Sequence, residues 1–140
     1  MPARKAKATW LGDLKNGNGQ MSFGGRFEQP FSFGTRFENG LGSNPEELIG
    51  AALAGCFSMA LSGGLGKAGF TPTRIESEAD VYIEMVDGGF KITKIDLRSE
   101  ATIPGIDPAQ FQEIAEATKK GCPVSQALAA TPINLAAKLV

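Results

Sequence analysis

The chain has 140 residues, of which 42% are hydrophobic and 21% are charged. These proportions are typical of a folded globular protein, and the length predicts a single domain spanning residues 1–140. The formal net charge of −1 carries no long run of like charges and excludes the strongly basic surface of a nucleic-acid-binding domain.

The N-terminal sequence MPARKAKATWLG lacks the apolar core of a signal peptide, and no stretch approaches 18 uninterrupted apolar residues. We therefore expect a cytoplasmic protein that does not enter a membrane. In that reducing compartment, two cysteines are expected to be catalytic, redox-active or metal-binding. A metal site is the weakest of these alternatives, because the chain has no histidine and neither cysteine has a nearby second thiol. We expect neither a metal nor another cofactor.

The first third of the chain is expected to be mostly extended. Residues 5–11 and 19–23 flank Asn-Gly dipeptides, which predict a hairpin with a tight turn at residues 16–19. Residues 31–33 alternate at the strand period, and residues 35–42 are expected to form a loop with Arg36 near its start.

A long helix is predicted from Pro45 to about Lys67. Asn44 is a suitable cap, and Glu46 and Glu47 are well placed against the helix dipole. The body of this helix is apolar on nearly every face and rich in Ala and Gly. That pattern predicts a buried central helix that a second helix can approach closely.

The rest of the chain predicts two strands, then two helices and a last strand. Residues 74–85 and 90–101 alternate between apolar and polar on either side of an Asp-Gly-Gly turn, so one sheet face is expected to be covered. Asp107-Pro108 is expected to begin a second helix that ends near residue 120. Cys122-Pro123 begins a shorter one that ends near Ala130, and residues 131–140 form a strand.

The two cysteines occupy different environments. Cys56 lies in the middle of the apolar helix, where burial alone would raise the pKa of its thiol, and its position fits core packing as well as chemistry. Cys122 lies at a predicted helix start, where unpaired backbone N–H groups favour a thiolate. The cysteines are 66 positions apart, so joint redox chemistry requires the fold to bring them together.

If Cys56 is to react, a positive charge must reach it, and Arg36 is the best candidate. Helical geometry distinguishes the two carboxylates: Glu47 lies on the face opposite Cys56, whereas Glu46 is only about 80° away. Glu46 nevertheless precedes Cys56 by a rise of about 15 Å. We therefore expect Arg36 and Glu46 of one subunit to meet Cys56 of another across a two-fold axis.

The chain contains three separated motifs: NPEEL at 44–48, AGCFSMAL at 54–61 and GCPVS at 121–125. Together they resemble the osmotically inducible protein C (OsmC) branch of the OsmC and organic hydroperoxide resistance family. The similarity extends to residues 35–38, 69–72 and 103–106. It implies an α+β fold with antiparallel sheets wrapped around long central helices in an intertwined homodimer.

The resemblance implies a peroxidase that reduces organic hydroperoxides in preference to hydrogen peroxide. Carried over by position, Cys56 corresponds to the attacking cysteine and Cys122 to the resolving one. Arg36 corresponds to the arginine that stabilises the thiolate, and Glu46 to the carboxylate that orients this arginine. The expected reductant is a dithiol of the lipoyl type.

One position departs from the family pattern. Leu53 stands where the family often has histidine or tyrosine, which changes the polarity expected of the pocket. Five residues are expected to line an apolar pocket for the alkyl group: Phe31, Phe33, Phe37, Phe57 and Met59. For Phe57 and Met59, core packing is the alternative.

Two other functions fit the same sequence. One is a different cysteine-thiol enzyme, acting in disulfide exchange or on thioesters, although the chain has neither a CxxC motif nor a histidine base. The other is a non-catalytic dimer that binds an apolar ligand between its subunits. The peroxidase requires both cysteines for turnover, whereas a binding protein requires neither.

Overall fold

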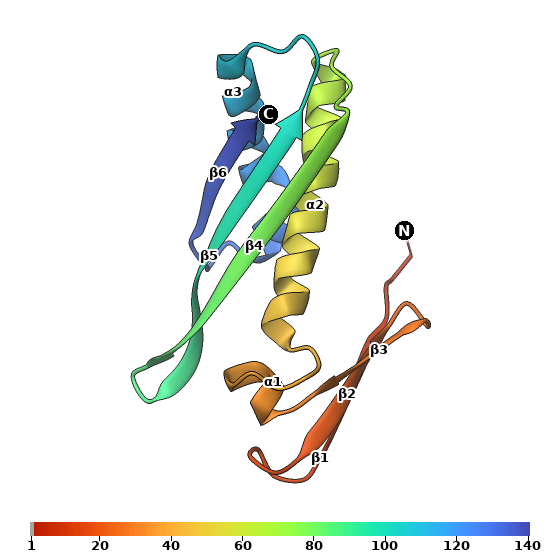
Figure 1. Ribbon diagram of the computed structural model, residues 1–140, viewed down its shortest axis with the longest axis vertical. Coiled ribbons are helices and arrows are strands. Elements are labelled where there is room, and N and C mark those ends of the chain that lie inside the picture. Colours follow the sequence, from red (N-terminus) through yellow and green to blue (C-terminus); the bar gives the residue numbers. More distant parts are fainter. Residues whose placement is uncertain (1) are drawn as a thin grey trace. The chain divides into compact units, whose positions relative to one another are not determined.

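The computed structural model describes residues 2–140, which form two compact units divided after Leu48. The elements follow one another in the order β1-β2-β3-α1-α2-β4-β5-α3-α4-β6 (Figure 1). Each unit has its own three-stranded sheet. Helix α2 (Pro45–Lys67) begins in the first unit and continues in the second. The assignment of one domain to the whole chain stays a prediction.

The first unit contains an antiparallel meander, and the predicted N-terminal hairpin is confirmed. The tight turn predicted at residues 16–19 is wrong, because Asn18 already pairs with Leu11. The connection is instead closed by Asp13, whose carboxylate accepts a hydrogen bond from Asn16 N at 2.7 Å. Aspartate side chains often close turns in this way, by accepting hydrogen bonds from nearby backbone N–H groups, and here such a turn forms in place of the Asn-Gly turn. The strands are β1 (Ala6–Leu11), β2 (Asn18–Phe23) and β3 (Phe27–Phe31).

Part of the segment expected to be extended or looped is the short helix α1 (Phe33–Phe37). Its start is fixed by a reciprocal capping box. Ser32 Oγ accepts a hydrogen bond from Thr35 N at 3.3 Å, and Thr35 Oγ1 accepts one from Ser32 N at 2.9 Å. The loop prediction was wrong because this box satisfies two backbone N–H groups that a loop would leave to water. Arg36 therefore lies in the last turn of a helix.

The sheet of the second unit has the order β4-β5-β6. The predicted hairpin is confirmed: β4 (Arg74–Val86) and β5 (Gly89–Thr102) are antiparallel. They are joined by Asp87 and Gly88, whose φ angles are 50° and 81°. Two consecutive residues with positive φ match the twist of the flanking strands.

The last strand departs from the expected antiparallel arrangement. Strand β6 (Ile133–Leu139) pairs with β5 in parallel, with Ile133 opposite Ile95. The chain reaches β6 through α3 (Pro108–Gly121) and α4 (Pro123–Ala127), and such helical crossovers return the chain in the same direction. The two predicted helices are thus confirmed, although α4 ends earlier than expected.

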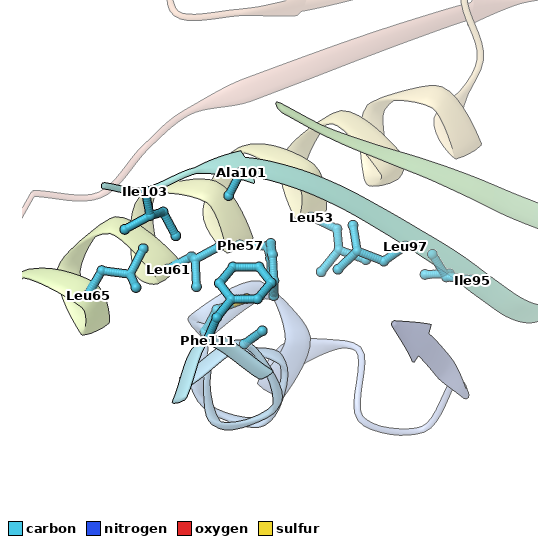
Figure 2. Packing of buried hydrophobic residues seen from close by; sticks show 11 residues of the cluster. Leu53, Phe57, Leu61, Leu65, Ile95, Leu97, Ala101, Ile103 and Phe111 are labelled. Carbon is cyan, nitrogen blue, oxygen red and sulfur yellow. The ribbon is translucent and has the colours of Figure 1, made fainter. Parts of the chain in front are cut away.

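The hydrophobic core of the second unit lies between one face of this sheet and helices α2 and α3. Figure 2 shows one stripe of α2 packed against β5 and against Phe111 of α3. Four residues at a spacing of four form the stripe, and each is fully buried: Leu53, Phe57, Leu61 and Leu65.

The opposite face of α2 is exposed in a single chain, so the expected burial of this helix on every side stays a prediction that requires a second helix. Met59 is 80% exposed. A side chain built at Gly55, Gly63 or Gly66 would meet nothing within 4 Å. Within residues 2–140, α2 alone has the length and apolar composition of a membrane-spanning helix, a property it shares with core helices of soluble proteins.

Candidate active site

The second unit brings the two cysteines together. Cys56 is in the middle of α2 and is partly exposed, whereas Cys122 is only 1% exposed. Cys122 joins α3 to α4: its N–H donates to Thr118 O at 2.9 Å, and it caps the start of α4. Both residues are free thiols, and their side chains interact directly.

The surroundings of Cys56 raise the pKa of its thiol. Burial is the largest cause, because it disfavours the charged thiolate. The backbone N–H of Val124 opposes this shift by donating a hydrogen bond to the sulfur, and the neighbouring Cys122 thiol adds to it. Within its own unit, therefore, Cys56 is held as a protonated thiol more firmly than an exposed cysteine.

Cys122 has a separate partner in Ser125. Cys122 Sγ lies 3.0 Å from Ser125 Oγ and accepts a hydrogen bond from Ser125 N at 3.4 Å. The first turn of α4 thus provides a donor for each sulfur, Val124 N–H for Cys56 and Ser125 for Cys122. The predicted helix start at Cys122 is confirmed, and one backbone N–H of its first turn, that of Ser125, points at the Cys122 sulfur.

The first unit brings Arg36 and Glu46 together. Arg36 Nε lies 3.1 and 3.2 Å from the two oxygens of Glu46, and Arg36 Nη2 lies 2.6 Å from Oε1. Glu46 is only 6% exposed. Two donors on one carboxylate fix the plane of the guanidinium, which a single contact would leave free to rotate.

Glu47 has a different role, as helical geometry indicated. It is exposed, and its carboxylate accepts a hydrogen bond from Ser43 Oγ at 3.0 Å. Its backbone N–H donates to Asn44 Oδ1 at 2.8 Å, so Asn44 caps α2 as expected. Of the two carboxylates, Glu46 is the one that engages Arg36.

An apolar depression of about 210 Å³ lies beside Arg36 in the first unit. The predicted Phe31, Phe33 and Phe37 line it together with Trp10 and Leu14. The other two predicted residues do not belong to its lining. Phe57 is a fully buried core residue and Met59 is exposed.

Sequence reasoning missed Trp10, Leu14, Val124 and Ser125. Trp10 could not be placed from the sequence, because the predicted turn gave the wrong register for this hairpin. Trp10 pairs with Gly19 across the strands, and its ring centroid lies 5.3 Å from that of Phe31. Ser125 carried a detectable signal, since it is three residues after a residue at a predicted helix start, the spacing of a capping contact.

No group of three or more His, Cys, Asp or Glu side chains suited to a metal ion occurs in the described part of the chain. The sulfur pair and the pair of Arg36 with Glu46 contain the four residues predicted to be catalytic.

Comparison with known proteins identifies the family. Residues 38–137 match the model of the OsmC-like protein family. The chain belongs to this family. The peroxiredoxin OsmC of Escherichia coli strain K12 is 57% identical over 129 residues, which cover 91% of this chain and 90% of that protein.

Solved structures of OsmC-like proteins have the same fold. An OsmC-like protein from Mycoplasma pneumoniae superposes with a TM-score of 0.77 at 17% identity, covering 99% of this chain and 98% of that one. The organic hydroperoxide resistance protein OhrB of Bacillus subtilis gives 0.70 at 25% identity, covering 97% and 98%. The predicted family and α+β fold class are confirmed.

Proposed function

We propose that this OsmC-like chain is a thiol-dependent peroxidase that reduces organic hydroperoxides to alcohols in cytoplasmic stress defence. The observation that carries the proposal is the direct interaction of a partly exposed cysteine with a buried one, Cys56 with Cys122. The 57% identity to a protein named peroxiredoxin OsmC supports it.

The reaction proceeds in three steps. The Cys56 thiolate attacks the distal oxygen of ROOH, forming a sulfenic acid and releasing RO⁻, which takes up a proton to give the alcohol. The Cys122 thiol then condenses with the sulfenic acid, forming a Cys56–Cys122 disulfide and water. An external dithiol, for which we propose the lipoyl type, reduces this disulfide and completes the cycle.

The first step requires a cation near Cys56, because burial raises the pKa of this thiol. We propose that Arg36 supplies it and that Glu46, through its two-point contact, sets the plane of the guanidinium. The same guanidinium would stabilise the negative charge that develops on the leaving oxygen. One arginine then assists both formation of the thiolate and cleavage of the O–O bond.

The exposed face of α2 supports a homodimer. This face is a continuous stripe of mostly small residues: Ala51, Ala52, Gly55, Met59, Ser62, Gly63 and Gly66. Small side chains allow two helices to approach closely, and a second copy of the chain is the occupant we propose. Since ten helical residues span about 15 Å, we also propose that Arg36 and Glu46 serve Cys56 of the partner subunit.

The aromatic depression beside Arg36 supports a preference for organic hydroperoxides. Its lining is mostly apolar, which favours an alkyl group over a small hydrated peroxide. The reacting O–O group would then lie at the guanidinium end of the depression.

Two cysteine variants test the proposal with cumene hydroperoxide and a dithiol reductant. Cys56→Ser is expected to abolish turnover, because the attacking sulfur is lost. Cys122→Ser is expected to reduce about one equivalent to form the sulfenic acid, after which a second equivalent of hydroperoxide oxidises this group to sulfinic acid, seen by mass spectrometry. Unchanged behaviour of both variants would contradict the proposal and favour the apolar-ligand binding protein.

A further inference from the structure

Ser125 is the one side chain other than Cys56 with a described contact to the sulfur of Cys122. Its hydroxyl oxygen is 3.0 Å from Sγ, and its backbone N–H also points at this sulfur, at 3.4 Å. Ser125 is 6% exposed and Cys122 is 1% exposed. Bulk water therefore has little access to this sulfur, and the protein must supply the polar group that responds when its charge changes.

A serine hydroxyl can serve both protonation states of the cysteine. It carries one proton and two lone pairs on a rotating bond, so it accepts a hydrogen bond from the S–H of the thiol. When the thiol proton leaves, the hydroxyl rotates and donates to the sulfur instead. An alanine or valine at this position would do neither.

We propose that Ser125 is a catalytic residue of the disulfide-forming step, in which its hydroxyl stabilises negative charge developing on Cys122 Sγ. This inference rests on the proposed role of Cys122 as the resolving thiol. As the new S–S bond forms, the S–OH bond of Cys56 breaks. The proton of Cys122 combines with the departing hydroxide to give water, and Ser125 is left unchanged.

The proposal can be tested without peroxide. Methyl methanethiosulfonate converts the more accessible Cys56 into a methyl disulfide. Cys122 then attacks Cys56 Sγ, forms the Cys56–Cys122 disulfide and releases methanethiol, which mass spectrometry follows as a loss of mass. The rate is measured in the wild type and in Ser125→Ala, Ser125→Thr and Ser125→Val. Thr and Val have nearly the same shape and differ in the hydroxyl, so this pair separates chemistry from packing.

Ser125→Ala and Ser125→Val are expected to close the disulfide about ten- to a hundredfold more slowly, the range that a lost hydrogen bond to a charged group produces. Ser125→Thr should stay within roughly threefold of the wild type, because it keeps the hydroxyl. An Ala variant as fast as the wild type would overturn the proposal, as would equal losses in Thr and Val.

A separate assay of hydroperoxide consumption by the wild type distinguishes the two proposals. If the hydroxyl controls disulfide closure but no hydroperoxide is consumed, the peroxidase assignment fails while the role of Ser125 in closure stands. If hydroperoxide is consumed and closure is independent of the hydroxyl, the peroxidase assignment stands and Ser125 is only a packing residue.

Discussion

At the scale of single residues, the Cys56 thiolate requires a nearby positive charge, and we propose that Arg36 supplies it. Burial raises the pKa of the Cys56 thiol, so the thiolate becomes scarcer as the pH falls and more abundant as it rises. Arg36 is held by a buried carboxylate and is a permanent cation. A cation beside the sulfur would extend the reactive range of Cys56 toward neutral pH.

Replacing Arg36 with Gln should therefore slow the alkylation of Cys56 by iodoacetamide at pH 7. We expect a loss of about ten- to a hundredfold, as for removal of a charge-assisted contact. The difference should disappear at alkaline pH, where the thiol ionises without help. Rates measured against pH in a Cys122→Ser background isolate Cys56.

The matched control is Arg26→Gln, which removes the same charge from an exposed turn between β2 and β3. Its pH profile should coincide with that of the wild type. A uniform loss of rate for Arg36→Gln at every pH would indicate a structural role for Arg36 and contradict its assignment to the thiolate.

At the scale of elements, three hydroxyl groups join α2 to the sheet. Ser58 Oγ lies 2.8 Å from both Ala54 O and Ser77 Oγ, and Ser77 Oγ lies 3.0 Å from Ser99 Oγ. Since Ser58 has one proton and Ala54 O can only accept, a consistent chain has Ser99 donating to Ser77 and Ser77 donating to Ser58. This chain anchors the turn of α2 that carries Cys56.

Ser77→Ala breaks the chain in its middle and should lower the free energy of unfolding by about 1–3 kcal/mol, because the buried Ser99 hydroxyl loses its partner. Ser99 is 1% exposed, so water cannot easily replace that partner. Urea unfolding monitored by circular dichroism measures the change.

The double variant Ser77→Ala/Ser99→Ala provides the internal control. It removes the stranded hydroxyl as well, so it should be destabilised less than the sum of the two single variants. A strictly additive result would argue that the two hydroxyls are energetically independent.

At the scale of the whole molecule, the unpartnered stripe of α2 should decide the oligomeric state. Gly63 lies in this stripe, and an added side chain there would meet nothing within 4 Å in a single chain. Gly63→Leu should therefore fold, helped by the better helix propensity of Leu, and should block the close approach of a second helix.

We expect Gly63→Leu to weaken dimerisation at least about tenfold, an effect of roughly 1.4 kcal/mol or more, and to lose peroxidase activity in parallel. Ala117→Leu is the control, because it places the same side chain on an exposed position of α3. Sedimentation velocity at several concentrations gives the association state. A fully active Gly63→Leu monomer would contradict the shared active site.

Features governed by neighbours in the chain could be predicted from the sequence. Asn44 and Pro45 set the start of α2, and the Asp87-Gly88 turn set the β4–β5 hairpin. The preference for Glu46 over Glu47 followed from helical angle alone. Such features depend on backbone geometry over a few residues, which residue type largely controls. The capping box of Ser32 and Thr35 depends on the same kind of local geometry, with the two residues three positions apart.

Other features were decided by the tertiary structure. Three such features involve segments far apart in the sequence. They are the parallel pairing of β6, the exposure of one face of α2 and the contact of Cys56 with Cys122. They depend on how the stripe of α2 packs with α3 on β5. By itself the sequence determined that Cys56 lies in the middle of a helix and Cys122 at the start of another. Packing decided that the two sulfurs meet, because their distance depends on how the helices that carry them pack against the shared core.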